Sequence, residues 1–263
     1  MKTKNIIWII ALILVIVLIA SLGYGYYKKA TMEVKNPIAT MEVENFGSIK
    51  IELYPELAPD TVANFITLAN RGFYDGLTFH RIVKDFMIQG GDKEGTGSGS
   101  ATMKDLKDDG DETAYTIKGE FIANGVEKNK LKFEEGVLGM ARSDYTQNYS
   151  PSLTEESYNS GSSQFFIMTK NNTSLNGYYT AFGKVIEGMD IVHKLEEVEV
   201  KAADNAEETT NVEVSTPVNP PKITSLKVET NGVDYGLPKT LEPFDAMAWM
   251  YKQYGLDPST LGQ

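Results

Sequence analysis

The chain has no cysteine and only two histidines, His80 and His193, among its 263 residues. The absence of cysteine excludes disulfide bonds, thiol catalysis and thiolate metal sites. Two imidazoles are too few for a histidine-rich metal site. A formal net charge of -11 argues against a nucleic-acid partner, which would require clustered lysine and arginine. We therefore expect no cofactor, no metal and no nucleic acid, whereas 41% hydrophobic residues allow a sizeable core.

Residues 6–22 carry no charge and are almost wholly aliphatic. A helix that rises ~1.5 Å per residue over positions 6–27 would span roughly 33 Å, about one bilayer core. Trp8 lies near one end of this stretch and three tyrosines lie near the other, as interfacial aromatic residues do. We expect residues 1–27 to be an uncleaved N-terminal transmembrane signal-anchor and residues 28–36 to be a linker.

A cleaved signal peptide is the alternative, because Lys2 and Lys4 form a positive n-region. The apolar run is longer than a typical signal-peptide core, and no clear Ala-x-Ala cleavage site follows it. Lys28 and Lys29 on the far side weaken the positive-inside signal, which still favours an amino terminus inside the cell. The segment thus predicts a single-pass protein of the cell membrane with its main domain outside the cytoplasm; cleavage would instead give a secreted protein.

Alternating and helical periods divide the rest of the chain. Residues 39–43 and 49–53 alternate and predict a β-hairpin, and Pro59 opens a helical stretch that Gly72 can close. We also expect strands over 136–140, 164–168, 181–186 and 223–229, a second helix over 189–195, and long polar loops over 143–163 and 201–216.

Residues 237–263 form a separate C-terminal extension. Its apolar positions 241, 244, 247, 248 and 251 recur at helical spacing, with a proline near the start and a glycine after the end. The segment has few basic residues. This favours a helix packed on the domain over a membrane-surface or partner-binding helix.

The stretch 79–92, Phe-His-Arg-Ile-Val-Lys-Asp-Phe-Met-Ile-Gln-Gly-Gly-Asp, is the most informative in the chain. Successive side chains of a strand point to opposite faces, so an unbroken strand cannot put Arg81 and Phe86 on one face. A bend near Lys84 and Asp85 would bring them together. The sequence therefore predicts a bent strand that gathers a guanidinium, an aromatic ring, a thioether and an amide.

Five blocks in this chain resemble the cyclophilins, a family of peptidyl-prolyl cis-trans isomerases, and they occur in the family's order. The blocks are Ala-Pro-Asp-Thr-Val-Ala-Asn-Phe (58–65), the run from Gly72 through residue 92, Gly-Val-Leu-Gly-Met-Ala-Arg (136–142), Gly-Ser-Ser-Gln-Phe-Phe-Ile (161–167), and Leu-Asn-Gly (175–177) followed by Phe-Gly-Lys-Val-Ile (182–186). Any one block would be a moderate signal, but five in order identify the stretch from Ile38 to Gly236 as similar to this family.

The resemblance implies a mainly β domain over residues 37–236, a closed eight-stranded antiparallel barrel with two capping helices. The N-terminal transmembrane helix and the C-terminal helical tail would be additions to it. The interior of such a small barrel is filled by side chains, so a substrate site must lie on its outer surface. The implied partners are proline-containing polypeptides in an extended or unfolded state.

The chemistry of such a site requires no covalent step. Amide resonance sets a barrier of about 18–20 kcal/mol to rotation about the peptide bond. A guanidinium aimed at the prolyl nitrogen hydrogen-bonds the twisted amide better than the planar one, which is differential binding of the transition state. By resemblance, Arg81 is the catalytic candidate, with Phe86 and Gln89 beside it.

The same resemblance predicts the substrate pocket. Phe86, Met87, Phe166 and Leu175 would line the place of the proline ring, and Gln89 and Gln164 would hold the substrate backbone. The implied substrate-binding residues are His80, Met87, Ala141, Arg142, Gln164, Phe166, Leu175 and Tyr179. For His80, a hydrogen-bonded structural role is an equal alternative.

Three positions depart from the best-known cyclophilins. Ser174 stands where a tryptophan usually forms the pocket edge, Tyr179 replaces a histidine of the far wall, and Arg142 replaces an asparagine of many relatives. Since that tryptophan contributes strongly to cyclosporin binding in the family, only weak cyclosporin binding is expected. The remaining pocket residues are those that catalysis requires.

Two rival functions remain. The chain could be a non-catalytic proline-peptide binding module or chaperone that kept the pocket without turnover. It could also be a scaffold that recruits a partner through its C-terminal helix. A proline-isomer-coupled assay separates the first rival from an enzyme.

Overall fold

The structure, a computed structural model, describes residues 12–24, 35–202 and 213–255. The chain divides into two compact units, residues 1–35 and 36–263. The described part of the first unit is a helix over residues 12–24 with exposed aliphatic side chains. Within the described ranges, no helix has both the length and the apolar character needed to cross a bilayer. The expected anchor over residues 1–27 falls partly outside these ranges, as does most of the expected linker.

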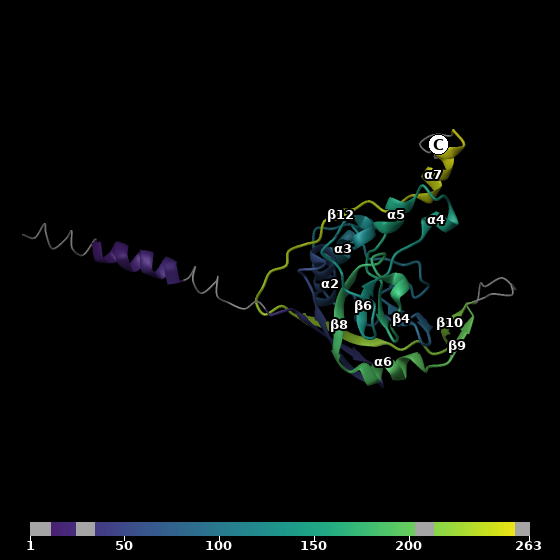
Figure 1. Ribbon diagram of the computed structural model, residues 1–263, viewed down its shortest axis with the longest axis horizontal. Helices are drawn as coiled ribbons and strands as arrows, with labels where there is room; N and C mark the ends of the chain where they lie inside the picture. Colours follow the sequence, from purple (N-terminus) through teal and green to yellow (C-terminus); the bar gives the residue numbers. More distant parts are fainter. Residues whose placement is uncertain (1–11, 25–34, 203–212, 256–263) are drawn as a thin grey trace, which may run out of the picture. The chain divides into compact units, whose positions relative to one another are not determined.

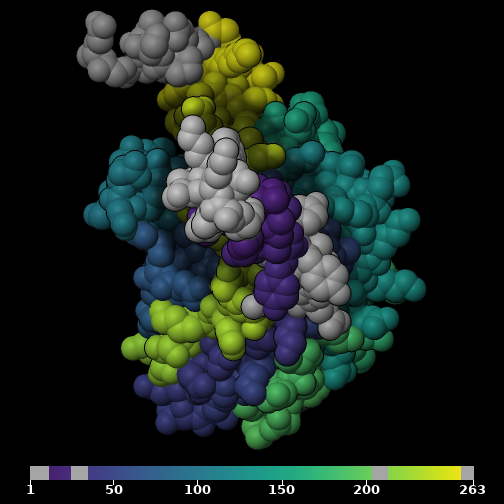
Figure 2. Space-filling view, turned by 90° about the vertical axis from the view of Figure 1, so that its left-hand side faces the viewer, coloured from purple at the N-terminus to yellow at the C-terminus, as the bar shows by residue number. Residues whose placement is uncertain are grey.

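Eight antiparallel strands of the second unit form one curled sheet (Figure 1). They are β1 (Ile38–Val43), β2 (Gly47–Leu53), β3 (Arg81–Val83), β4 (Met87–Gly90), β6 (Val137–Met140), β7 (Phe165–Met168), β8 (Ala181–Glu187) and β11 (Ile223–Glu229). Their order across the sheet is β11-β1-β2-β8-β6-β7-β4-β3. Alternate residues of β1 and β2 are buried, as the period-2 pattern predicts. In Figure 2 the yellow-green surface of β11 lies against the dark blue surface of these two strands.

The prediction of a closed barrel is wrong, because no ladder joins the edge strands β11 and β3 in the described part of the sheet. The segments that precede them are linked by an isolated antiparallel bridge between Thr78 and Lys222, and the N–H of Phe79 donates to the carbonyl of Pro221 at 2.9 Å. Continued along this register, the ladder would place Pro221 opposite Phe79 and Pro220 opposite His80, directly before β3. Proline has no N–H to donate to a ladder, so the pairing stops there. The fold is a mainly β, eight-stranded half-barrel with an open seam at this point.

Two helices pack on the sheet where the sequence predicts them. Helix α2 (Pro59–Asn70) has proline in its first turn, and its buried face includes Phe65 and Leu68. The carboxylate of Glu120 accepts hydrogen bonds from the N–H groups of Asp60 (3.3 Å) and Thr61 (2.8 Å) at the start of this helix. Helix α6 (Met189–Glu196) follows Gly188 and packs on β2 and β4.

The two long loops expected from the sequence contain regular structure. The first holds helices α4 (Tyr145–Asn148) and α5 (Thr154–Tyr158). The second was predicted wrongly, because strands β9 (Val200–Ala202) and β10 (Val214–Pro217) pair antiparallel within it. Strand β10 packs beside β3. The remaining short elements are α3 (Met103–Leu106), β5 (Thr116–Ile117), η1 (Ile122–Asn124) and η2 (Thr173–Leu175).

The C-terminal extension is attached to the domain at two places. Strand β12 (Thr240–Leu241) pairs with β5. Beyond it, the ring of Phe244 lies 4.6 Å from that of Tyr145, and Trp249 of helix α7 (Ala246–Gln253) lies 6.1 Å from Tyr149. Figure 1 shows α7 next to α4, as these ring contacts require. The extension therefore packs on the 143–163 segment.

Candidate active site

The predicted bend lies in the hairpin formed by β3 and β4. Asp85 adopts φ of 58°, and the N–H of Phe86 donates to the carbonyl of Val83 at 3.1 Å. The register sets Arg81 opposite Gln89 and Val83 opposite Met87. A left-handed residue is uncommon outside glycine, and aspartate is among the residues that tolerate it. The turn thus brings Phe86 to the face that carries Arg81 and Gln89.

A pocket of about 190 Å³ opens on this face. Its lining residues are Arg81, Phe86, Met87, Gln89, Ala141, Arg142, Phe166, Leu175 and Tyr179. These are all of the site residues predicted from the sequence except His80 and Gln164. The structure therefore brings together residues that are spread over almost a hundred positions of the chain.

The apolar wall of the pocket is centred on Phe166. Its ring stacks on Phe133 at 5.6 Å with an interplanar angle of 24°, and it meets Tyr179 edge-on at 5.9 Å. A Cβ at Gly139 would lie 2.3 Å from the Phe166 ring, so only glycine leaves room for the ring there. Sequence reasoning missed Phe133, which supports the wall from behind and belongs to none of the family-like blocks.

A directed chain of hydrogen bonds forms the polar side of the site. Nη1 of Arg81 donates to Oε1 of Gln89 at 3.2 Å, and Nε2 of Gln89 donates to Oε1 of Gln164 at 2.9 Å. Nε2 of Gln164 then donates to the carbonyls of Gly97 (3.0 Å) and Gly99 (2.8 Å). Each amide has one orientation that satisfies these contacts. Gln164 thus joins the site through Gln89 although it does not line the pocket.

The glycine-rich loop at the end of this chain is held by Asp92. This carboxylate is 1% exposed and accepts from the N–H groups of Glu94 (2.8 Å) and Thr96 (2.9 Å). Burial opposes ionisation, but the backbone hydrogen bonds outweigh it and lower the pKa of Asp92. Sequence reasoning missed this role; the signal for it was an aspartate three residues before a segment in which glycine recurs at positions 95, 97 and 99.

Of the predicted residues His80 and Arg142, the first lies outside the pocket and the second lines it. His80 is 7% exposed, does not line the pocket, and makes no hydrogen bond of normal geometry with a described residue. Burial lowers the pKa of His80, which favours the neutral ring. The guanidinium of Arg142 lies 4.4 Å from the centre of the Tyr179 ring and 5.2 Å from that of Tyr158, as cation–π contacts do. The side chain of Arg142 therefore stabilises the edge of the pocket through its contacts with Tyr158 and Tyr179.

A second cavity, of about 380 Å³, adjoins the pocket and shares Gln89, Ala141 and Arg142 with it. The glycine-rich loop forms one side of this cavity. Tyr145 of the 143–163 segment and Pro243 of the C-terminal extension also line it. Both added segments therefore contribute surface next to the site.

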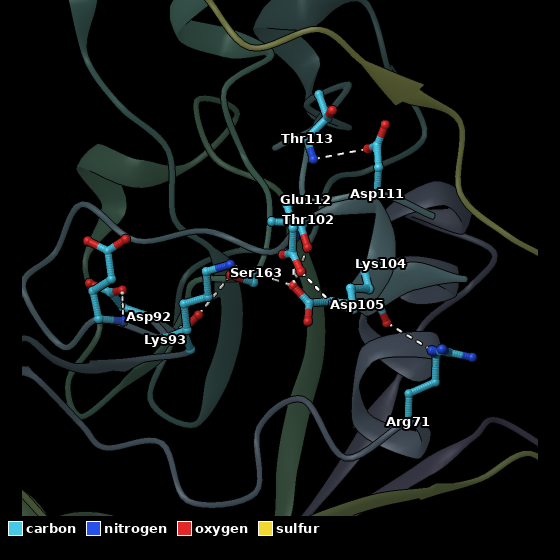
Figure 3. Close-up of polar contacts among 12 residues, drawn as sticks. Arg71, Asp92, Lys93, Thr102, Lys104, Asp105, Asp111, Glu112, Thr113 and Ser163 are labelled. Atoms are coloured by element: carbon cyan, nitrogen blue, oxygen red, sulfur yellow. Dashed lines mark hydrogen bonds and ion pairs between the residues drawn. The ribbon is translucent and has the colours of Figure 1, made fainter. Parts of the chain in front are cut away.

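The acidic segment 102–113 does not line the pocket, and it is held mainly by hydrogen bonds and an ion pair among its own residues. Oδ2 of Asp105 accepts from the N–H of Thr102 (2.8 Å) and its hydroxyl (2.9 Å), and Lys104 pairs with Glu112 at 2.6 Å (Figure 3). Arg71 donates to the carbonyl of Asp105 at 2.9 Å. In the ranges that the structure describes, no group of three or more histidine, aspartate or glutamate side chains is placed to hold a metal ion.

Sequence reasoning also missed Glu213, which contacts the edge of Arg81 that faces away from Gln89. Nε of Arg81 donates to Oε1 of Glu213 at 2.7 Å, and Nη2 donates to Oε2 at 2.8 Å. The hydrogen bond from Arg81 lowers the pKa of Glu213, so the pair is ionised. Because Glu213 precedes β10 in a stretch predicted to be a loop, no local signal pointed to it.

Similarity to known proteins agrees with this fold and site. A family profile described as "Cyclophilin type peptidyl-prolyl cis-trans isomerase/CLD" matches residues 38–228. The match covers most of the chain, and the chain belongs to this family. It carries a cyclophilin domain and is a peptidyl-prolyl cis-trans isomerase.

Individual relatives show the extent of the likeness. The chain is 40% identical over 153 residues to "Peptidyl-prolyl cis-trans isomerase B" of Bacillus subtilis, which covers 58% of this chain and 86% of that protein. It is 39% identical over 160 residues to "Peptidyl-prolyl cis-trans isomerase-like 1" of Rhizopus delemar, covering 61% and 81% respectively. A solved cyclophilin-type isomerase of Cryptosporidium parvum, in the presence of the dipeptide Ala-Pro, superposes with a TM-score of 0.55 at 26% identity, covering 74% of this chain and 99% of that one.

Proposed function

We propose that this isomerase acts on X-Pro bonds in extended or unfolded polypeptides, with Arg81 as its catalytic residue. One observation carries the assignment: Nη1 of Arg81 lies at the pocket, beside an apolar wall that includes Met87 and Phe166. This observation supports the proposal, because a guanidinium at this position would face a prolyl ring bound against the apolar wall.

The proposed mechanism is preferential stabilisation of the twisted amide. As the X-Pro bond rotates, its nitrogen loses conjugation and regains a lone pair, which can accept a hydrogen bond from Arg81. The planar ground state offers no such acceptor, so the interaction lowers the barrier without tightening ground-state binding. Phe86 would hold the ring in place, and Gln89 would fix both the guanidinium and the substrate backbone.

The other predicted residues are proposed to bind the peptide. Leu175 and Tyr179 complete the apolar wall, and Ala141 and Arg142 border the rim. Gln164 would align the peptide backbone through Gln89. His80 is proposed to have a structural role instead, because its ring is buried and does not line the pocket. The dipeptide named with the Cryptosporidium relative is of the class that such a pocket would accept.

A proline-isomer-coupled peptide assay on the full chain tests this assignment. We expect Arg81→Ala to lower kcat/KM by about a hundredfold, the range in which removal of one transition-state hydrogen-bond donor falls. Arg71→Ala is the matched control, because Arg71 is an arginine bonded to Asp105 and Asp108 outside the site. Equal turnover in the wild type and Arg81→Ala, together with retained peptide binding, would favour the non-catalytic binding module.

We further propose that the enzyme is tethered to the cell membrane and works outside the cytoplasm. The uncharged run 6–22 supports this, as do the exposed aliphatic side chains of helix 12–24. Membrane fractionation and protease treatment of intact cells test it. Recovery of a shortened chain in the medium would support a cleaved signal peptide instead, and protection from protease would place the domain inside the cell.

A further inference from the structure

The guanidinium of Arg81 is shared between two sets of partners. Its Nη1 edge faces Gln89 and Met87 at the pocket, and its Nε and Nη2 edge is taken by both oxygens of Glu213. A two-point contact of this kind fixes the plane of the guanidinium as well as its position. The Glu213 contact therefore leaves one nitrogen, Nη1, directed at the substrate.

Glu213 is one of three glutamates C-terminal to β8 that contact the β3–β4 hairpin. The carboxylate of Glu196 accepts from the N–H of Asp85 at 3.1 Å, and Glu197 pairs with Lys84 at 2.6 Å. Glu213 makes the third contact, with Arg81, and Ser215 behind it is 7% exposed. Glu213 directly precedes strand β10, which pairs with β9 and packs beside β3, so its position is set by a paired strand.

We propose that Glu213 is a positioning residue for the isomerase reaction, acting through Arg81. It holds the guanidinium in the orientation that directs Nη1 into the pocket. An arginine side chain has several freely rotating bonds, and restraint of them before substrate binds removes an entropic cost from the transition state. This inference rests on the proposed catalytic role of Arg81.

The alternative is an inhibitory contact, in which Glu213 neutralises the guanidinium and competes with the substrate. The geometry favours positioning, because Glu213 lies on the edge opposite the pocket and does not line it. A competing carboxylate would have to lie on the Nη1 edge. The two readings predict opposite signs for the effect of removing the charge.

The variant Glu213→Gln tests the proposal in the full chain, with Glu197→Gln as the matched control. Both residues are exposed acids of one segment that bind the β3–β4 hairpin, but only Glu213 touches Arg81. Exposed ion pairs contribute little to stability, so both variants are expected to fold. We expect Glu213→Gln to lower kcat/KM by about two- to fivefold, through kcat, with unchanged affinity for an Ala-Pro peptide. Glu197→Gln should equal the wild type.

A double-variant cycle supplies the second readout. Lysine keeps the charge of Arg81 but lacks the planar fork that Glu213 grips. The effect of Glu213→Gln should therefore shrink in an Arg81→Lys background. Wild-type turnover in Glu213→Gln, a rise in turnover, an equal loss in Glu197→Gln, or an undiminished effect beside Arg81→Lys would each overturn the proposal. An inactive wild type, or turnover unaffected by Arg81→Ala, would instead overturn the proposed catalytic role.

Discussion

The side-chain amides of Gln89 and Gln164 meet at 2.9 Å, with Gln89 donating and Gln164 accepting. This contact sets the direction of the hydrogen bonds that the other ends of the two amides make. Gln89 must present its oxygen to Arg81, and Gln164 must present its nitrogen to the glycine-rich loop. The guanidinium of Arg81 is thereby linked to a glycine-rich loop whose own residues do not line the pocket.

Replacement of Gln164 by glutamate tests this linkage. A carboxylate cannot donate to the carbonyls of Gly97 and Gly99, so the loop loses two hydrogen bonds. We expect a loss of about 1–3 kcal/mol in the free energy of unfolding and about a tenfold fall in kcat/KM. Urea unfolding and the peptide assay measure the two effects. Gln147→Glu, on the exposed helix α4, is the control, and equal effects of the two variants would contradict the prediction.

Replacement of Gly139 by alanine tests the packing of the apolar wall. The new methyl group would meet the rings of Phe166 at 2.3 Å and Phe133 at 2.7 Å, so Phe166 must move into the pocket. We expect a loss of about 1–3 kcal/mol of stability, as overpacking of a core typically costs. A higher KM for proline peptides should accompany it, since the pocket becomes smaller. A Gly139→Ala variant with wild-type stability and KM would contradict the prediction, because the wall would then accommodate the methyl group.

His193 gives the fold a pH dependence with a defined sign. Its hydrogen bond to Glu196 at 2.7 Å, joined by Glu135 at 3.2 Å, raises its pKa above the ordinary 6.5. Folding therefore favours the protonated ring. This contribution is complete below pH 6.5 and is lost as pH rises through the raised pKa of the folded state.

We accordingly expect the wild type to lose stability relative to His193→Gln as pH rises from about 6 to 9. Urea unfolding at a series of pH values measures the difference. Lys194→Gln, which removes a neighbouring ion pair with Asp190, is the control, and its effect should be the same at every pH. A pH-independent difference for His193→Gln would refute the assignment.

Ser174 should control the affinity for cyclosporin. It is an exposed residue of η2, next to Leu175 in the pocket wall, and its hydroxyl donates to Asn172 at 2.6 Å. Tryptophan at such an edge adds a large apolar face, and anchors of this kind contribute about 2 kcal/mol or more. We expect Ser174→Trp to tighten cyclosporin binding by at least tenfold in calorimetric titrations. Ser152→Trp, at an exposed site on the 143–163 segment, should leave the affinity unchanged.

The sequence predicted the pocket well because its residues lie in short blocks with strong local constraints. The bend near Lys84 and Asp85 was predicted from strand parity together with the condition that Arg81 and Phe86 share a face, and the structure has it at Asp85. Most of the strands and both principal helices begin and end within a residue or two of their expected bounds. Local periodicity suffices for such elements, since each has one face in the core.

The features that the sequence did not predict correctly share a different cause. Each depends on contacts between residues that are far apart in the chain. Barrel closure failed because Pro220 and Pro221 fall where the last ladder would run, a relation that only the register reveals. The pair of Arg81 and Glu213 joins residues far apart in the chain through a hairpin with little periodicity. Phe133 likewise acts only through its stack on Phe166.

The open seam beside β3 also bears on how this enzyme could be re-engineered. A strand paired on one side only can accept a new neighbour without the loss of an existing ladder. The β9–β10 insertion occupies this position, between α6 and β11. Exchange of that insertion for another hairpin would change the surroundings of the arginine while the pocket wall stays intact. The seam is therefore a natural graft point for tuning turnover and substrate preference in this domain.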